Sequence, residues 1–331
     1  MHSNVGNGSV FGLHDLQREL LSLLPEATLS VGEATLELAS LPNDAPRLIS
    51  ATVLEGSTLE ARRVDDPPVS GFRAFLDGTQ RSVVATYIGG APIVWGHVAA
   101  VVRERHNRRM QTWGAALRET RIYAPRAVLP SVTWNTLAAR YDDRLIDTTE
   151  SGIEGGLHPF ALRDAALHRV QAHREVAEQR LAELWCASER DPLFIDGGIS
   201  GSERVAVSAH TVGVVKSHRT LYAEDAALSA VLALDLGERS SVFRVTSPRR
   251  TTVASWYLRL RDPKGHDPMW GLLRVEVANP PGEMLHRIGE RADLVSRWIL
   301  AEANPLALPD GRWDKMVYGV RDCEEFLRAV S

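Results

Sequence analysis

The chain opens with apolar side chains at helical spacing and then changes to a shorter, strand-like alternation. Residues 10–25 place their apolar positions on one face of a helix, and Pro25 ends this pattern. Residues 27–70 alternate apolar and polar positions as short strands do, and they end at a pair of prolines. We therefore expect residues 1–70 to form an N-terminal helix and a small strand region.

Three apolar runs with short connections follow this region. They cover residues 72–78, 82–90 and 92–102, and Gly89 and Gly90 give a turn signal between the last two. Short connections between neighbouring strands predict an antiparallel meander.

Helical spacing returns in the middle of the chain. A long amphipathic helix is predicted at 161–188, and it leads into PLFIDGG at 192–198, a short apolar strand that ends in Asp-Gly. The other elements that we expect are short helices at 107–120 and 131–140, a strand or turn at 204–216, a helix at 224–235, strands at 241–246, 252–261 and 270–278, a helix at 291–303 and a final element at 314–329.

The order of these elements predicts an α/β fold of the RNase H-like class. In that class a helix after three antiparallel strands returns the chain, so that the fourth strand runs parallel to the first. We expect a mixed sheet, an antiparallel meander plus a parallel strand, flanked by helices and carrying small N-terminal and C-terminal additions. The RNase H-like domain would span 71–303, and a C-terminal extension at 304–331 would pack on it.

Composition places the chain among ordinary globular proteins. Apolar residues make up 44% and charged residues 24%, and no run is long and apolar enough to span a membrane. The N-terminus lacks the basic start and apolar run of a secretion signal, so the expected compartment is the cytoplasm. The two cysteines are far apart in sequence and predict reduced thiols, with neither a disulfide framework nor a zinc site.

The net charge of −4 argues against a generally basic nucleic-acid coat protein, but basic residues can still line one groove. Two basic segments are candidates for DNA contacts or for solvated surface. They are Arg103, Arg105, Arg108 and Arg109, and later Arg244, Arg249 and Arg250.

Two carboxylates close apolar runs in the same way. Asp77 and Asp196 each follow four or five apolar-rich positions and precede a glycine. If the two strands are parallel neighbours, both carboxylates emerge at one edge of the sheet and repel each other unless a cation lies between them. Each Asp-Gly taken alone is also ordinary turn chemistry. As a pair joined by a long helix, they favour a site for Mg²⁺ or Mn²⁺.

A third carboxylate is expected from the helix that precedes Asp196. That helix runs antiparallel to the strand, so a step back of about 13 Å at ~1.5 Å per residue reaches the neighbourhood of residue 178. Glu175 and Glu178 fall in this window, and either can instead be a solvated helix charge. Asp293 begins another amphipathic helix, where an acid either caps the helix or supplies a fourth ligand.

Several segments in this order resemble the NurA family of RNase H-like nucleases that process DNA ends. AFLDG and LFIDGGISG resemble its two acidic motifs, and VGVVKSHRTLY resembles its apolar segment with a lysine and a following tyrosine. SWYLRL and GLLRVEV resemble its late strand pair. The resemblance runs from about residue 71 to 303, and order and spacing carry it.

The resemblance implies a DNA nuclease that uses Mn²⁺ or Mg²⁺, with two ions held by Asp77, Asp196 and the helix glutamate. Lys216 would face the substrate phosphate or the leaving group, and Tyr222 would be an active-site tyrosine. Family members act on DNA as dimers with a hexameric HerA ATPase, in end processing or phage defence, so this chain is expected to do the same. It has no P-loop of its own.

The sequence also predicts one ion pair and leaves two alternative functions open. Arg274 and Glu276 are predicted to form a structural ion pair. One alternative is an RNase H-like nuclease that acts on RNA. The other is a catalytically inactive subunit that only scaffolds an ATPase, for which loss of Asp77 would leave function intact.

Overall fold

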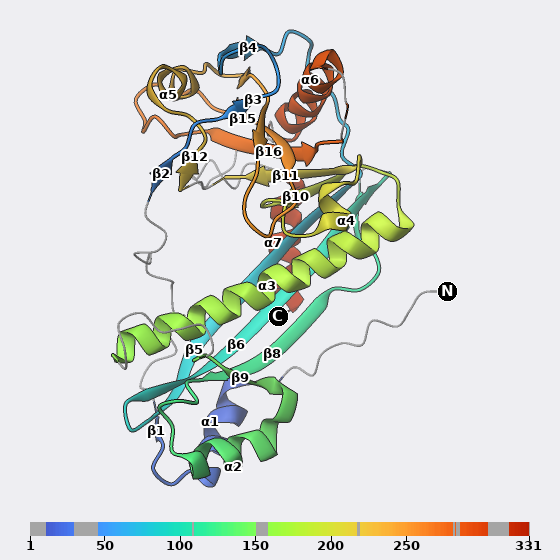
Figure 1. Cartoon of the computed structure of the whole chain (residues 1–331). Coiled ribbons are helices and arrows are strands. Elements are labelled where there is room, and N and C mark those ends of the chain that lie inside the picture. The colour runs from blue at the N-terminus through green and yellow to red at the C-terminus, as the bar shows by residue number, and fades with distance from the viewer. Residues whose placement is uncertain are drawn as a thin grey trace.

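The computed structural model describes residues 11–29, 46–107, 109–149, 158–216, 219–280, 282, 285–303 and 318–330. Arg108, residues 30–45 of the expected strand region and the start of the expected final element lie outside the described residues. Within them, one long mixed sheet runs through the molecule and carries helices on both faces (Figure 1).

The helices correspond closely to the amphipathic segments of the sequence. They are α1 (Leu13–Leu23), α2 (Ser131–Tyr141), α3 (Pro159–Ser188), α4 (Glu203–Ala206), α5 (Asp225–Leu232), α6 (Leu285–Glu302) and α7 (Tyr318–Val330). Those expected at 10–25, 131–140, 161–188, 224–235 and 291–303 are confirmed.

The strands fall into an N-terminal set, a long central set and a C-terminal set. The N-terminal set is β1 (Thr28–Leu29), β2 (Arg47–Leu48), β3 (Thr52–Val53) and β4 (Ala61–Arg63). The central set is β5 (Ala74–Ile88), β6 (Ala91–His106), β7 (Arg109–Thr112), β8 (Leu117–Ala124), β9 (Leu145–Asp147), β10 (Leu193–Asp196), β11 (Thr211–Val215) and β12 (Thr220–Leu221). The C-terminal set is β13 (Glu238–Ser240), β14 (Phe243–Val245), β15 (Val253–Arg259) and β16 (Leu272–Ala278).

The centre of the sheet has the order β8-β6-β5-β10-β11. Strands β5, β6 and β8 are antiparallel neighbours, and β10 is parallel both to β5 and to β11. The long helix α3 connects the meander to β10 and crosses the sheet diagonally (Figure 1). The expected RNase H-like α/β fold, with its meander, its parallel strand and its flanking helices, is therefore what the chain adopts.

Alternating positions on β5 and β6 divide the core between the two faces of the sheet. Phe75 belongs to a cluster with buried side chains of α6 and α7, whereas its neighbours Ala74 and Leu76 belong to a cluster with buried side chains of α3. Because side chains of a strand alternate between faces, α3 covers one face and α6 and α7 cover the other. Cys323 of α7 lies against this second face, and its Sγ contacts the Phe75 carbonyl oxygen at 3.4 Å.

Two predictions of secondary structure were wrong, the break between the first two strands and the helix at 107–120. The runs 72–78 and 82–90 form one continuous strand, β5, because β6 pairs with it along its length, through Asp77 and Gly78 as well. The Asp-Gly pair therefore makes no turn. The helix expected at 107–120 is instead β7 and the start of β8, because the chain reverses at Asn107, which has φ 49°, and β7 pairs back onto β6.

The described strands of residues 1–70 pair with distant parts of the chain. β1 pairs with β5, β2 with β12, β3 with β14 and β4 with β13. The C-terminal helix α7 lies across β5 and β6. In the described part of the chain, no helix has the length and apolar character needed to cross a membrane.

Candidate carboxylate site

Asp77 lies within β5, next to the end of β10. The parallel register pairs Ile195 with Leu76, and no pair of these two strands follows it, so Asp77 and Asp196 are the next positions on adjacent strands. Asp77 is 5% exposed, and its Oδ1 accepts a hydrogen bond from the Gly78 backbone at 2.8 Å. The sheet topology therefore brings the two aspartates together, as the sequence predicted.

Asp196 is the last residue of β10 and is bound by a lysine from the neighbouring strand. Lys216 follows β11, and its Nζ lies 2.7 Å from Asp196 Oδ2. The lysine side chain is 13% exposed and the aspartate side chain 21%. Lys216 therefore lies at the carboxylates, and its contact with the substrate phosphate or the leaving group, which the resemblance implies, stays a prediction.

Glu178 of α3 lies directly over Gly78. A Cβ built at Gly78 would lie 2.2 Å from Glu178 Oε1, so a larger residue there would displace the end of the Glu178 side chain. Arg174, one turn earlier on α3, donates to Glu178 Oε1 at 2.9 Å and to Gln80 Oε1 of β5 at 3.2 Å. Glu175 is exposed and accepts from Gln171 at 2.9 Å. Of the two expected helix glutamates, Glu178 is therefore the one turned to the aspartates.

The three carboxylates are costly to ionise together. Burial raises the pKa of Asp77 well above its usual range, and the charges of Asp196 and Glu178 raise it further against the opposing charge of Lys216. Burial also raises the pKa of Glu178 to about 7, although Arg174 opposes the shift. Raised pKa values in a set of neighbouring carboxylates mark a site with too little positive charge.

The loop after Asp196 is held by a buried ion pair on β16. The backbone N–H of Ile199 donates to Glu276 Oε2 at 2.9 Å, and Arg274 donates to Glu276 Oε1 at 2.8 Å. Gly213 allows this loop to cross β11 closely, because a Cβ there would lie 2.8 Å from the Gly197 carbonyl oxygen. Arg274 and Glu276 form the expected ion pair, which fixes the backbone beside Asp196.

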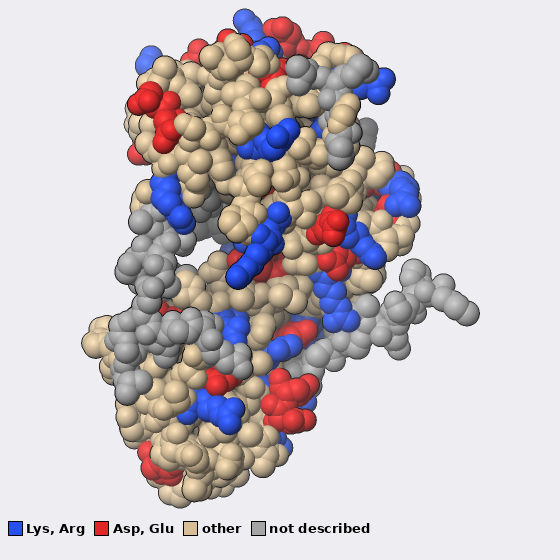
Figure 2. All heavy atoms as spheres, in the orientation of Figure 1, with Lys and Arg blue, Asp and Glu red and all other residues tan. Residues whose placement is uncertain are grey.

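The carboxylates lie between two pockets. A pocket of about 520 Å³ on the α3 side is lined by Glu175, Glu178, Asp196, Arg249 and Arg250, and one of about 900 Å³ along β5 is lined by Asp77 and Asp196. Asp196 and Arg174 line both pockets. Figure 2 shows basic and acidic side chains close together around the hollow at mid-height of the molecule.

Arg249 and Arg250 reach the site through a loop that is bound to its backbone. The Thr251 N–H donates to the Ser200 carbonyl oxygen at 2.9 Å, and Arg249 adopts a positive φ of 61°. Arg244, the third arginine of this expected DNA-binding group, lies on β14, is exposed and lines neither pocket.

Tyr222 lies next to the site's supporting ion pair. Its ring stacks on Phe243 at 5.7 Å, and the Arg274 guanidinium lies over it at 5.1 Å. Its backbone N–H donates to the Tyr257 hydroxyl at 2.8 Å. Tyr222 therefore contacts Arg274, two residues away from Glu276, and lines neither of the two pockets.

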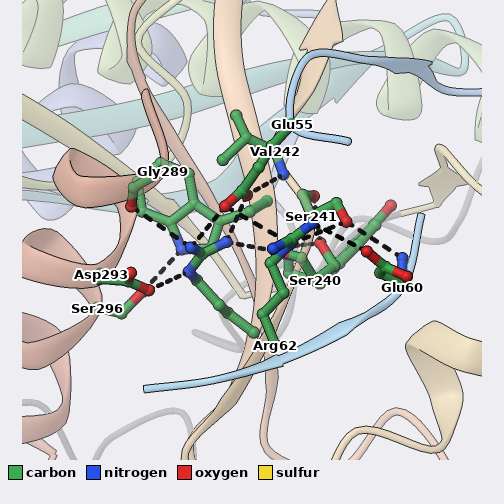
Figure 3. Close-up of polar contacts among 12 residues, drawn as sticks. Glu55, Glu60, Arg62, Ser240, Ser241, Val242, Gly289, Asp293 and Ser296 are labelled. Atoms are coloured by element: carbon green, nitrogen blue, oxygen red, sulfur yellow. Dashed lines mark hydrogen bonds and ion pairs between the residues drawn. The ribbon is translucent and has the colours of Figure 1, made fainter. Parts of the chain in front are cut away.

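Asp293 lies in a different cluster, which Figure 3 shows. Its Oδ1 accepts a hydrogen bond from Arg239 Nε at 2.6 Å, and the same guanidinium donates to both oxygens of Glu55 at 2.7 and 3.0 Å. Arg239 is 2% exposed. The structure thus does not bring Asp293 to Asp77, and its carboxylate binds a buried arginine.

The donor set of the carboxylate site suits a hard divalent cation, because the carboxylates of β5, β10 and α3 lie near enough for the charges of Asp196 and Glu178 to raise the pKa of Asp77. Among the described residues, no three His, Cys, Asp or Glu side chains stand as a ready-made cage. Here Lys216 and Arg174 bind two of the carboxylates instead. Arg174 was not predicted from the sequence, although its spacing of four residues from Glu178 places both side chains on one face of the helix.

No protein-family model matches the chain, and no curated protein matches it significantly in sequence. The site therefore has to be interpreted from its own geometry.

Proposed function

We propose that this protein is a metal-dependent DNA nuclease. The observation that carries the proposal is the convergence of Asp77, Asp196 and Glu178 from β5, β10 and α3, with raised pKa values for Asp77 and Glu178. A divalent-cation site needs buried carboxylates whose negative charge the neighbouring cationic side chains do not fully balance. Bound Mg²⁺ or Mn²⁺, as one ion or a pair, would activate a water and stabilise the leaving oxygen in phosphodiester hydrolysis.

The basic side chains around the carboxylates have separate tasks in this proposal. Arg249 and Arg250 face the pocket that Glu178 and Asp196 line, so they would hold phosphates of the substrate. Lys216, whose Nζ lies 2.7 Å from Asp196 Oδ2, would orient that carboxylate and stabilise the negative charge of the scissile phosphate. Glu276 would keep the loop at Ile199 in place, because it accepts that residue's N–H.

The resemblance to NurA nucleases adds the substrate and the assembly to the proposal. A DNA end would be the substrate, the chain would act as a homodimer, and a HerA-type hexameric ATPase would deliver the DNA.

The test is cleavage of labelled DNA by the purified chain with Mn²⁺, Mg²⁺ or EDTA, with and without a HerA-type ATPase. Asp77→Asn and Asp196→Asn should lower cleavage by roughly 10²–10³-fold, because each removes several kcal/mol of charge stabilisation. Asp191→Asn is the matched control, since Asp191 is exposed and lies five residues before Asp196.

Cleavage that needs no metal, or that survives both substitutions, would contradict the proposal. A preference for RNA of the same sequence would keep the site and change the substrate. Stable binding of the ATPase without cleavage under any condition would favour an inactive scaffold subunit.

A further inference from the structure

The pocket along β5 and β6 is a groove that leads away from the carboxylates. Its volume is about 900 Å³, and its lining includes Asp77, Arg81, Trp95, His97, Arg174 and Arg328. Arg81 pairs with His97 across the two strands, four residues along β5 from Asp77. At ~3.3 Å per residue, this part of the groove lies about 13 Å from the carboxylates.

His97 lines this groove and has a buried polar atom without a hydrogen-bond partner among the described residues. The residue is 6% exposed, and its Nδ1 shares a hydrogen bond with Thr120 Oγ1 at 2.9 Å. Its Nε2 is buried and has no hydrogen-bond partner among the described residues. A buried polar atom without a partner costs free energy, so its retention calls for an explanation such as a ligand.

The groove also combines basic and aromatic side chains. The Arg81 guanidinium lies 5.9 Å from the centre of the Trp95 ring, which is stacked on His97 at 6.0 Å. Trp95 is fixed, because its Nε1 donates to the Phe11 carbonyl oxygen at 3.1 Å. Arg328 of α7 is 65% exposed and pairs with Glu324, another residue of the groove lining, at 3.2 Å, so a phosphate would compete with this carboxylate. Arg174 connects the groove to the pocket on the α3 side.

We propose that this groove binds a single DNA strand on its way to the carboxylates, with Arg81 and Arg328 on phosphates and His97 Nε2 on a phosphate or a base. The inference rests on the proposed function and specifies its substrate as single-stranded. Grooves for single strands combine positive charge with aromatic rings. His97 is 6% exposed and its Nε2 is buried, so contact requires the ring to turn towards the groove. An unstacked base or a phosphate of an extended strand can then approach it, whereas bases stacked inside a duplex are not free to do so.

The test measures binding without cleavage. The Asp77→Asn/Asp196→Asn chain is titrated into a fluorescent oligothymidylate of about 12 nucleotides, within the ~4–16 that single-strand sites cover. Arg81→Gln and Arg328→Gln, each added to this chain, should weaken binding and reduce the slope of log K against log salt by about 0.7. His97→Asn should weaken binding by about 2- to 10-fold and leave the slope unchanged, because it removes one hydrogen bond and no charge.

Arg63→Gln is the matched control, because Arg63 lies on β4 with a side chain that is 82% exposed. The inference is overturned if the Arg81 and Arg328 variants bind like this control, or if a duplex or an RNA strand of the same sequence binds more tightly than the DNA single strand. Arg81 and Arg328 are exposed, so these two variants keep the test valid even if His97→Asn fails to fold.

The two proposals can fail separately. Groove-dependent binding by a chain whose wild type cleaves no DNA would uphold the groove and overturn the nuclease. Metal-dependent cleavage with no effect of the groove variants on binding would uphold the nuclease and overturn the groove.

Discussion

Two clusters of charged side chains in this protein reach opposite electrostatic outcomes. The Arg239 cluster consists of Arg239, Glu55 and Asp293, with Arg62 3.5 Å from Glu55. Burial works to raise the pKa of Glu55, but the hydrogen bonds and charge of Arg239 outweigh it, and the net pKa is lowered (Figure 3). The two carboxylates of this cluster, Glu55 and Asp293, are thus balanced by two arginines, Arg239 and Arg62.

The carboxylate cluster consists of Asp77, Asp196 and Glu178 with Lys216 and Arg174. Burial dominates there, and the pKa values of Asp77 and Glu178 rise in spite of the two cations. We infer a different role for each cluster from this difference. A matched buried cluster holds β13, the Glu55 segment and α6 together, whereas an unmatched one stores unfavourable charge that a ligand can relieve.

Removing the base from the matched cluster should have the largest effect on stability. Arg239→Met removes the buried partner of Glu55 and leaves only the more exposed Arg62 beside it, so the free energy of unfolding should fall by about 3–5 kcal/mol in urea titrations. The exposed Arg63→Gln on the adjacent β4 should change it by less than about 0.5 kcal/mol. A loss no larger than the control's would show that the cluster is not structural.

Moving a carboxylate without removing its charge tests the unmatched cluster. Gly78→Ala places a methyl group where Glu178 Oε1 now lies, and the end of that flexible side chain must shift. Misplacement of a catalytic group by about 1 Å can cost roughly 10²-fold, and we expect DNA cleavage to fall by about that factor. Gly201→Ala, whose Cβ would have its nearest neighbour at 3.8 Å, should leave the rate unchanged. If the Gly78→Ala and Gly201→Ala proteins cleave DNA at the same rate, Glu178 takes no part in the reaction.

Neutralising a carboxylate of the unmatched cluster should stabilise the fold. Because the pKa of Glu178 is about 7 in the folded protein, above the ordinary value, Glu178 favours folding at low pH, and this benefit is lost as pH rises through about 7. Glu178→Gln should therefore raise the free energy of unfolding by about 1–3 kcal/mol near pH 8 and change it little near pH 4.

The control for this change is Glu203→Gln, at an exposed glutamate in the first turn of α4. A Glu178→Gln protein that is less stable near pH 8, measured by chemical unfolding at both pH values, would contradict the assignment of unfavourable charge to this cluster.

The smallest effect is expected at Asp293. Its side chain is 45% exposed, so Asp293→Asn should cost about 0.5–1 kcal/mol of unfolding free energy and leave DNA cleavage unchanged. Cleavage assays and urea titrations on one preparation check both statements. Loss of cleavage as large as that of Asp77→Asn would make Asp293 part of the catalytic site after all.

The sequence predicted the fold where local signals and topology agree. Helix α3 follows from its length of uninterrupted helix-forming sequence and β10 from its short apolar run before Asp-Gly, and the rule that a helix returns the chain in parallel puts Asp196 next to Asp77. The continuous strand β5 could not be predicted, because Asp77 and Gly78 locally favour a turn and only pairing with β6 overrides that preference.

The candidate site was predictable to about one helical turn. The rise of a helix locates its third carboxylate near residue 178, but the choice of Glu178 over Glu175 depends on the space above Gly78. Asp293 was ambiguous because its partner Arg239 lies on β13, 54 residues earlier, and no local pattern connects them.

We propose that Asp77, Asp196 and Glu178 form a site for a divalent cation. Calorimetric titration of Mn²⁺ into the chain near pH 8 tests it most directly, with Asp77→Asn and Asp293→Asn as the paired variants. We expect Mn²⁺ to bind the wild type and Asp293→Asn, with release of protons that increases towards pH 7, and binding to be lost in Asp77→Asn. Absence of binding to the wild type, or equal binding by both variants, would contradict it.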